Sequence, residues 1–142
     1  MLIDYLYNPH VREATLDDAE ALEALEQELF PDNCFGIQTL KSELMHGDGW
    51  VLERDGEIVA YALIRTDGHL TDLTRLGVLD KHRRQGYATI LLFKAMTRAS
   101  KTMLTVRRDN TAALSLYKRW GFHIVGRLEN SWVMLLATSD GK

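Results

Sequence analysis

The chain has 142 residues, of which 46% are hydrophobic and 26% are charged, a composition typical of one soluble globular domain. Its formal net charge of −3 excludes a general positive field that would attract nucleic acid or an anionic membrane. The single cysteine, Cys34, excludes an internal disulfide and a multi-cysteine zinc site, and we expect it to be a small, half-buried side chain. Residues 1–10 match neither a signal peptide nor a membrane span, so we expect a cytoplasmic protein without membrane contact.

Apolar periodicity then predicts alternating strands and helices. Thr15, three residues before Asp18, is a favoured N-cap for a first helix that closes near Pro31. The dipeptide Asp55-Gly56 between two apolar runs predicts a tight hairpin, because both residues accept positive φ angles. The expected elements are strand 11–14, helix 15–31, helix 39–45, strands 50–54 and 57–64, strand 69–78, helix 88–99, strand 103–107, helix 110–120, and a closing hairpin of 122–125 and 132–136 that turns near Glu129-Asn130. We therefore predict a single domain, residues 1–142, of mixed α/β class around one central sheet.

The stretch KHRRQGYATILL, residues 81–92, joins a strand to a helix and predicts an anion site. The first N–H groups of a helix lack intrahelical partners, and the helix dipole adds partial positive charge there. Gly86 lets an anion approach the backbone, Ala88 keeps the first turn slim, and Arg83 and Arg84 supply charged donors. A diphosphate fits these features better than one carboxylate, although a solvated basic turn is the alternative. The spacing is neither a P-loop nor a dinucleotide fingerprint, so ATP and NAD are poor candidates.

Four segments in the same order resemble the GNAT superfamily of N-acetyltransferases. Arg83-x-x-Gly86-x-Ala88 resembles its acetyl-CoA pyrophosphate loop, and VREATLDDAEAL, GEIVAYALI and NTAALSLYKRWGF are similar to its first strand and helix, its third strand and its second cofactor-contacting segment. The resemblance covers about residues 11–136. It implies the GNAT fold, with a mixed, mostly antiparallel central sheet flanked by helices, and transfer of an acetyl group from acetyl-CoA to a primary amine. Because many members are dimers, it also allows a homodimer.

The resemblance also implies site residues. Gly77 inside a strand is costly unless the strand bulges or another chain comes close, and in the family the equivalent strand bulges and its N–H groups contact the pantetheine arm and the thioester carbonyl. The implied cofactor contacts are Leu76, Gly77, Val78, Arg83, Arg84, Gln85, Gly86, Tyr87, Ala88, Thr89 and Asn110. Asn110 also suits the N-cap of the helix that it opens. Tyr117 matches the family tyrosine that protonates the departing CoA thiolate, and a core aromatic is the alternative.

The general base is the weakest part of the pattern. The chain resembles the ribosomal-protein N-terminal alanine acetyltransferases most closely around TVRRDNTAALSLY, but where they carry a glutamate this chain has Thr105, which cannot act as a base. Asp72, six residues before Val78, stands where histone-type members place a glutamate base. The two-residue period of a strand predicts that Asp72 shares a face with Thr74, Leu76 and Val78. An exposed strand-end carboxylate, proton loss through ordered water, and an amine that arrives neutral are the alternatives.

The acceptor amine stays open. The resemblance implies that the loop FPDNCFG and the closing hairpin flank it, but GRLENSW is shorter than the tyrosine-bearing hairpin of the ribosomal-protein enzymes. A peptide N-terminus, a lysine side chain and a small amine all fit. A GNAT module that binds acyl-CoA without turnover is an alternative function. Nucleic-acid binding through Lys81, His82, Arg83, Arg84, Arg107 and Arg108 is less favoured, because no aromatic residues are interleaved for base stacking. His10, His46 and His123 lack ligand spacing, so no metal is expected.

Overall fold

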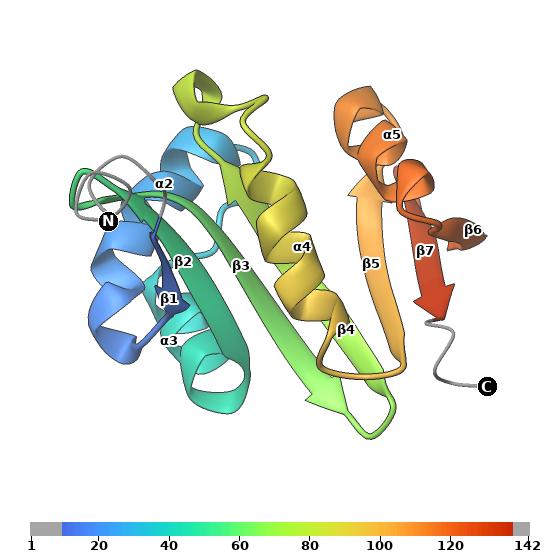
Figure 1. Cartoon of the computed structure of the whole chain (residues 1–142), viewed down its shortest axis with the longest axis horizontal. Helices are drawn as coiled ribbons and strands as arrows, with labels where there is room; N and C mark the ends of the chain where they lie inside the picture. Colours follow the sequence, from blue (N-terminus) through green and yellow to red (C-terminus); the bar gives the residue numbers. More distant parts are fainter. Residues whose placement is uncertain (1–9, 138–142) are drawn as a thin grey trace, which may run out of the picture.

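The computed structural model describes residues 10–137 (Figure 1). Within them seven strands form one sheet in the order β1-β2-β3-β4-β5-β7-β6, and every neighbouring pair is antiparallel except β4 and β5. The strands are β1 (His10–Glu13), β2 (Asp48–Arg54), β3 (Glu57–Asp67), β4 (Leu70–Val78), β5 (Lys101–Arg107), β6 (His123–Arg127) and β7 (Ser131–Ala137). The helices are α2 (Ala19–Leu29), α3 (Ile37–His46), α4 (Tyr87–Met96) and α5 (Thr111–Arg119), with short 3-10 turns η1 (Leu16–Asp18) and η2 (Asp80–His82). The predicted fold class is therefore confirmed.

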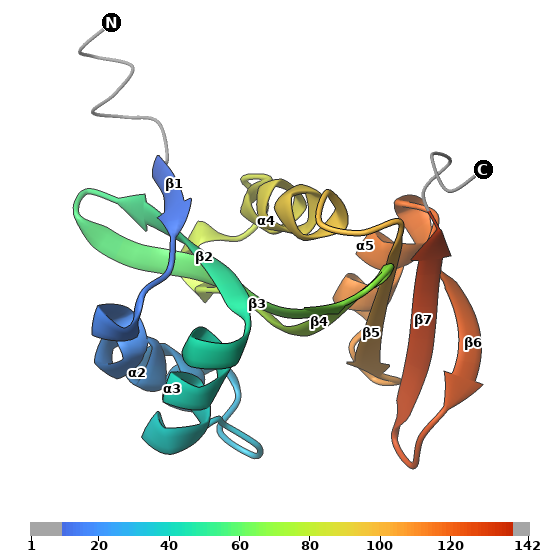
Figure 2. The same cartoon turned by 90° about the horizontal axis from the view of Figure 1, so that it is seen from below.

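Helices cover both faces of the sheet. Figure 2 shows α2 and α3 on one side of β2 and β3, and α4 on the other. The α2–α3 side packs a small apolar core that includes Leu22, Leu40 and Tyr61, whereas α4 and α5 pack over a larger one around Leu91 and Leu104. Strands β2 and β3 contribute alternate residues to both cores, which explains their nearly continuous apolar sequences.

Local turn signals set several boundaries correctly. The hairpin between β2 and β3 turns at Asp55 (φ 56°) and Gly56 (φ 82°), as the dipeptide predicts. The closing hairpin turns around residues 129–130, with Leu128 and Ser131 paired through their backbones. Helix α4, however, ends at Met96 and not at residue 99, because the Thr97 hydroxyl donates to the Lys94 carbonyl at 2.7 Å and closes the last turn.

A bulge in β4 changes which residues share a face. The register with β3 shifts between Leu63 and Ile64, which leaves Thr74 as the extra residue of β4. Thr74 donates to Glu43 of α3 and Arg75 to Glu26 of α2, so both of these neighbours face the α2–α3 side. The expectation that Asp72 shares a face with Leu76 and Val78 is therefore wrong. Asp72 lies on the α3 side near Glu43, whereas Leu76 and Val78 pack against the α4-side core.

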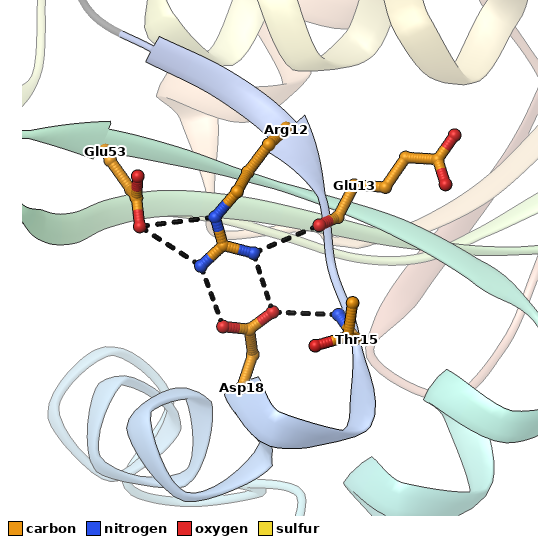
Figure 3. Close-up of polar contacts among 5 residues, drawn as sticks. All are labelled: Arg12, Glu13, Thr15, Asp18 and Glu53. Atoms are coloured by element: carbon orange, nitrogen blue, oxygen red, sulfur yellow. Dashed lines mark hydrogen bonds and ion pairs between the residues drawn. The ribbon is translucent and has the colours of Figure 1, made fainter.

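An ion-pair network fastens the edge strand β1 to the rest of the sheet (Figure 3). Arg12 donates to both carboxylate oxygens of Asp18, at 2.9 and 3.0 Å, and to Glu53 of β2, at 3.1 and 3.2 Å. Asp18 also accepts the N–H of Thr15 at 2.8 Å, as expected for a residue three places after an N-cap. The hydrogen bonds from Arg12 lower the pKa of Asp18 below its ordinary value.

The expectation of a half-buried Cys34 is wrong. Cys34 is exposed and not half-buried, because the aromatic rings of Phe30 and Phe35 occupy the inward positions of the segment that connects α2 and α3. Between residues 10 and 137, no helix is long and apolar enough to cross a membrane.

Candidate active site

The sheet opens between β4 and β5. These parallel strands pair over only four residues each, ending at Leu73 and Leu104, and no described strand pairs with the β5-facing edge of residues 74–78. The Leu79 N–H donates to Val59 of β3 at 3.0 Å. Because backbone groups alternate along a strand, the N–H groups of Leu76 and Val78 point to the open edge, whereas that of Gly77 points to β3. The open edge therefore offers unpaired donors to an extended ligand.

A cleft of about 600 Å³ lies at this opening. All the predicted site residues except Asp72 and Gln85 line it, so the fold gathers parts of β4, the loop before α4 and helix α5 around one space. Seven further lining residues were not predicted from the sequence: Leu29, Phe30, His82, Ala112, Ala113, Leu116 and Arg119. The helical spacing of Ala112, Leu116 and Arg119 on either side of Tyr117 was the available signal for those on α5.

The loop before α4 has the geometry of a phosphate site. Gly86 is the N-cap of α4 with φ +83°, and Arg84 also has a positive φ of 64°. A Cβ built on Gly86 would meet no protein atom within 4 Å, so the backbone angle, and not crowding, favours glycine at this position. The first N–H groups of α4 are directed toward this end of the cleft. Arg83 is held by the Val78 carbonyl at 3.1 Å and by Asp80 at 3.0 Å.

Gln85 points away from the cleft. Its side-chain oxygen accepts a hydrogen bond from Arg54 of β2 at 2.8 Å, and Arg54 also donates to the Tyr87 hydroxyl at 2.7 Å. These two contacts hold the loop on the side that faces away from the cleft. Gln85 therefore supports the loop conformation with its side chain, whereas Tyr87 lines the cleft.

Gly77 is required by packing from α2. A Cβ at this position would lie 2.9 Å from Leu29, 3.2 Å from Tyr61 and 3.3 Å from Phe30. The strand does bulge, as expected for this segment, but at Thr74 and not at Gly77. The end of α2 therefore lies directly over the open part of β4 and forms one wall of the cleft.

Tyr117 and Asn110 come from opposite ends of α5. Tyr117 is only 7% exposed, packs edge-to-face on Phe122 and lines the cleft, so its ring belongs to the core while one side of it faces the cleft. Burial raises the pKa of Tyr117 to about 12, which keeps its phenol protonated at neutral pH. Asn110 accepts the Ala113 N–H at 3.2 Å as the N-cap of α5, and it too lines the cleft.

Carboxylates gather on the α2–α3 face of β4 outside the cleft. Glu26 is fully buried and accepts four hydrogen bonds. Glu43 accepts from Arg65 and Thr74. The side-chain carboxylate of Asp72 accepts no hydrogen bond from another described residue, and its pKa is raised by burial and by the nearby charge of Glu43. Thr105, at the position where the ribosomal-protein enzymes carry a glutamate, is exposed on β5.

Comparisons with known proteins agree with this geometry. The acetyltransferase (GNAT) family profile matches residues 11–122. An N-alpha-acetyltransferase of Sulfolobus acidocaldarius is 31% identical, over 87% of this chain and 84% of its own. The ribosomal-protein-S18-alanine N-acetyltransferase of Escherichia coli superposes with a TM-score of 0.84 at 21% identity, covering 92% of this chain and 94% of its own. NAA60 of Arabidopsis thaliana, solved with acetyl-CoA, gives 0.79 at 21% identity, covering 92% and 99%. Since the family profile spans most of the chain, from β1 to the end of α5, the protein belongs to the GNAT family of acetyltransferases and is an enzyme.

Proposed function

We propose that this enzyme transfers the acetyl group of acetyl-CoA to the α-amino group of a polypeptide N-terminus. The observation that carries the proposal is the continuity of the cleft. The loop before α4 (residues 83–86, called the phosphate loop below), the unpaired edge of β4 and Tyr117 line one space. The Sulfolobus relative, named an N-alpha-acetyltransferase, supports this acceptor, and the acetyl-CoA bound by NAA60 supports the cosubstrate.

The cofactor would lie along residues that the cleft already presents. The diphosphate fits the N–H groups at the start of α4, with Arg83 and Arg84 as charged donors. The pantetheine arm is an extended amide chain, so it can pair with the backbone groups of Leu76 and with the N–H of Val78 as a strand would. The thioester would then reach the middle of the cleft, between β4 and Tyr117.

The reaction needs one bond formed and one broken. The neutral amine attacks the thioester carbonyl, and the oxyanion that forms is stabilised by backbone N–H groups of the open β4 edge, a kind of contact worth about 3–4 kcal/mol in the transition state. When the C–S bond breaks, the thiolate takes a proton from the Tyr117 phenol, which is protonated at neutral pH. The attacking nitrogen loses its extra proton to solvent or to a base, and the Tyr117 phenolate regains a proton from solvent.

Asp72 is the candidate base and would act through water. It lies four residues before Leu76, about 13 Å along an extended strand, so its carboxylate cannot reach the amine directly. Glu26 and Glu43 on the same face are occupied by hydrogen bonds from Arg75, Arg65 and their neighbours. Asp72 accepts none from the described residues, which leaves its oxygens free to take a proton from a water chain.

A remote base favours an α-amino group over lysine. With an ordinary pKa of about 7.7, roughly a third of α-amino groups are neutral at pH 7.4, against about 0.1% of lysine side chains with a pKa near 10.4. Since no described carboxylate lines the cleft, an acceptor that arrives neutral has the advantage.

One experiment separates the acceptors. The enzyme is incubated with acetyl-CoA and a peptide that carries a free N-terminus and an internal lysine, and the release of CoA thiol and the acetylated position are measured. The matched control is the same peptide with a blocked N-terminus. Acetylation of the α-amine and no turnover of the control support the proposal. Turnover of the blocked peptide at lysine would overturn it.

A further inference from the structure

A buried ion pair lies beside the cleft and takes no part in the chemistry described above. Arg75, two residues before Gly77, donates to both oxygens of Glu26 at 2.9 Å. The same carboxylate accepts the Tyr61 hydroxyl at 2.6 Å and the Phe35 N–H at 2.8 Å. With four donors, the Glu26 carboxylate is saturated, so it cannot serve as the base.

Arg75 also holds the segment that connects α2 and α3, residues 30–36. Its guanidinium lies 4.1 Å from the centre of the Phe30 ring and 4.0 Å from that of Phe35, and it donates to the Asn33 carbonyl at 2.9 Å. One side chain of β4 therefore contacts the beginning, the middle and the end of this segment, and Glu26 binds its Phe35 N–H. A planar, bidentate guanidinium can make these contacts together, whereas an ammonium cannot.

This segment begins at a wall of the cleft, to which it contributes Phe30. Phe30 lines the cleft beside Gly77. The pKa of Arg107, at the end of β5, is raised mainly by its hydrogen bond with Asp109, and the charge of Asp32 adds to this rise. The segment therefore begins beside Gly77 of β4 and carries a charge that acts on the end of β5. The phosphate loop lies beyond the other end of the open edge, after Val78, and contacts neither Arg75 nor Glu26 through any hydrogen bond described.

A buried charge pair of this kind is a costly way to gain stability. Desolvation of the two charges offsets most of their attraction, and apolar residues of the same volume often stabilise a core equally well. What the pair does supply is a fixed geometry, because each donor and acceptor has one arrangement that satisfies it. The geometry points to Arg75 and Glu26 as positioning residues for the segment 30–36, called the acceptor wall below. Binding of the acceptor, but not of CoA, then depends on them. This inference rests on the proposed function.

The test compares Arg75→Lys with Arg12→Lys. Arg12 is a matched control, because its guanidinium also donates to both oxygens of one carboxylate, that of Asp18, but it lies on β1 at the far edge of the sheet (Figure 3). Calorimetry measures the affinity for CoA and for a conjugate in which CoA is joined through an acetyl linker to the N-terminus of a short peptide. Hydrogen exchange measures the protection of the Phe35 amide.

In Arg75→Lys we expect at least tenfold weaker conjugate binding, CoA affinity within twofold of the wild type, and at least tenfold faster exchange at Phe35. Arg12→Lys should change none of these. Should Arg75→Lys fail to fold, Phe35→Leu removes one ring of the stack and should weaken conjugate binding alone, about threefold. The inference is overturned if conjugate affinity survives, or if CoA affinity falls by the same factor. If the wild type binds the conjugate no better than CoA, the proposed function is overturned. If in addition the Phe35 amide exchanges at the same rate in Arg75→Lys as in the wild type, the anchoring role of Arg75 is overturned as well.

Discussion

Two glycines with nearly the same φ angle make it possible to separate the cost of backbone strain from a loss of phosphate binding in the loop before α4. Gly86 has φ +83° and Gly56, in the β2–β3 turn, has φ +82°, and a Cβ on either would meet no protein atom within 4 Å. Alanine at either position must therefore cost about 1 kcal/mol of unfolding free energy from backbone strain alone. For a chain of this length this lowers Tm by about 3 °C.

Only the Gly86 variant should also lose cofactor affinity. Its new methyl group projects into the space that a phosphate would approach, so we expect Gly86→Ala to weaken acetyl-CoA binding at least tenfold, and Gly86→Glu, which adds bulk and like charge, to abolish it. Calorimetry with acetyl-CoA and dephospho-CoA, beside urea denaturation without ligand, separates the two effects. If Gly86→Ala and Gly56→Ala bind acetyl-CoA equally well, the loop does not hold the diphosphate and the reasoning fails.

Three further predictions concern the catalytic chemistry and the stability of the fold. Tyr117→Phe should lower kcat about a hundredfold with little change in the KM for acetyl-CoA, because it removes a proton donor and keeps the ring; an equal loss in KM would indicate a packing role. Asp72→Asn should lower kcat/KM most below about pH 7.5, where an α-amino group is largely protonated, and little at pH 9; a pH-independent loss would exclude Asp72 as the base. The pKa of Asp18 is lowered by Arg12, so its contribution to stability is complete above about pH 4 and is lost as the pH falls through the lowered value. Asp18→Asn should therefore cost about 1 kcal/mol in urea denaturation at pH 7 and much less at pH 2, and an equal cost at both would contradict this ion pair.

Short-range signals carried most of what the sequence could predict. The turn at Asp55-Gly56 and the cap at Asn110 depend on residues within four positions of one another, and the structure shows both. The loop motif Arg83-x-x-Gly86-x-Ala88 is local as well, and all three of its named residues line the cleft. Turns and caps depend on residues that are close together in the sequence, so they can be predicted without knowledge of the fold.

The errors arise where a distant residue or one extra residue decides the outcome. The bulge at Thr74 adds one residue to β4, so side chains before it point to the opposite face from the one that a strict two-residue period predicts from the residues after it. That period therefore misplaces Asp72. Gln85 is turned away by Arg54, which lies 31 residues earlier in the chain. Arg75 meets Glu26 across 49 residues, and no local pattern indicates that pairing.

The same bulge explains how so short a piece of β4 meets several requirements at once. An extra residue places Thr74 and Arg75 together on the α2–α3 face, where Arg75 can anchor the acceptor wall, and it returns Leu76 and Val78 to the α4-side core. Gly77, between them, accepts the end of α2 at a distance that no side chain would permit. Because β5 diverges after Leu73, the N–H groups of Leu76 and Val78 have no strand partner on the open edge. Pairing β5 further along β4 would satisfy these groups and close the cleft, so the unpaired strand end is the feature of the sheet that makes a binding site here.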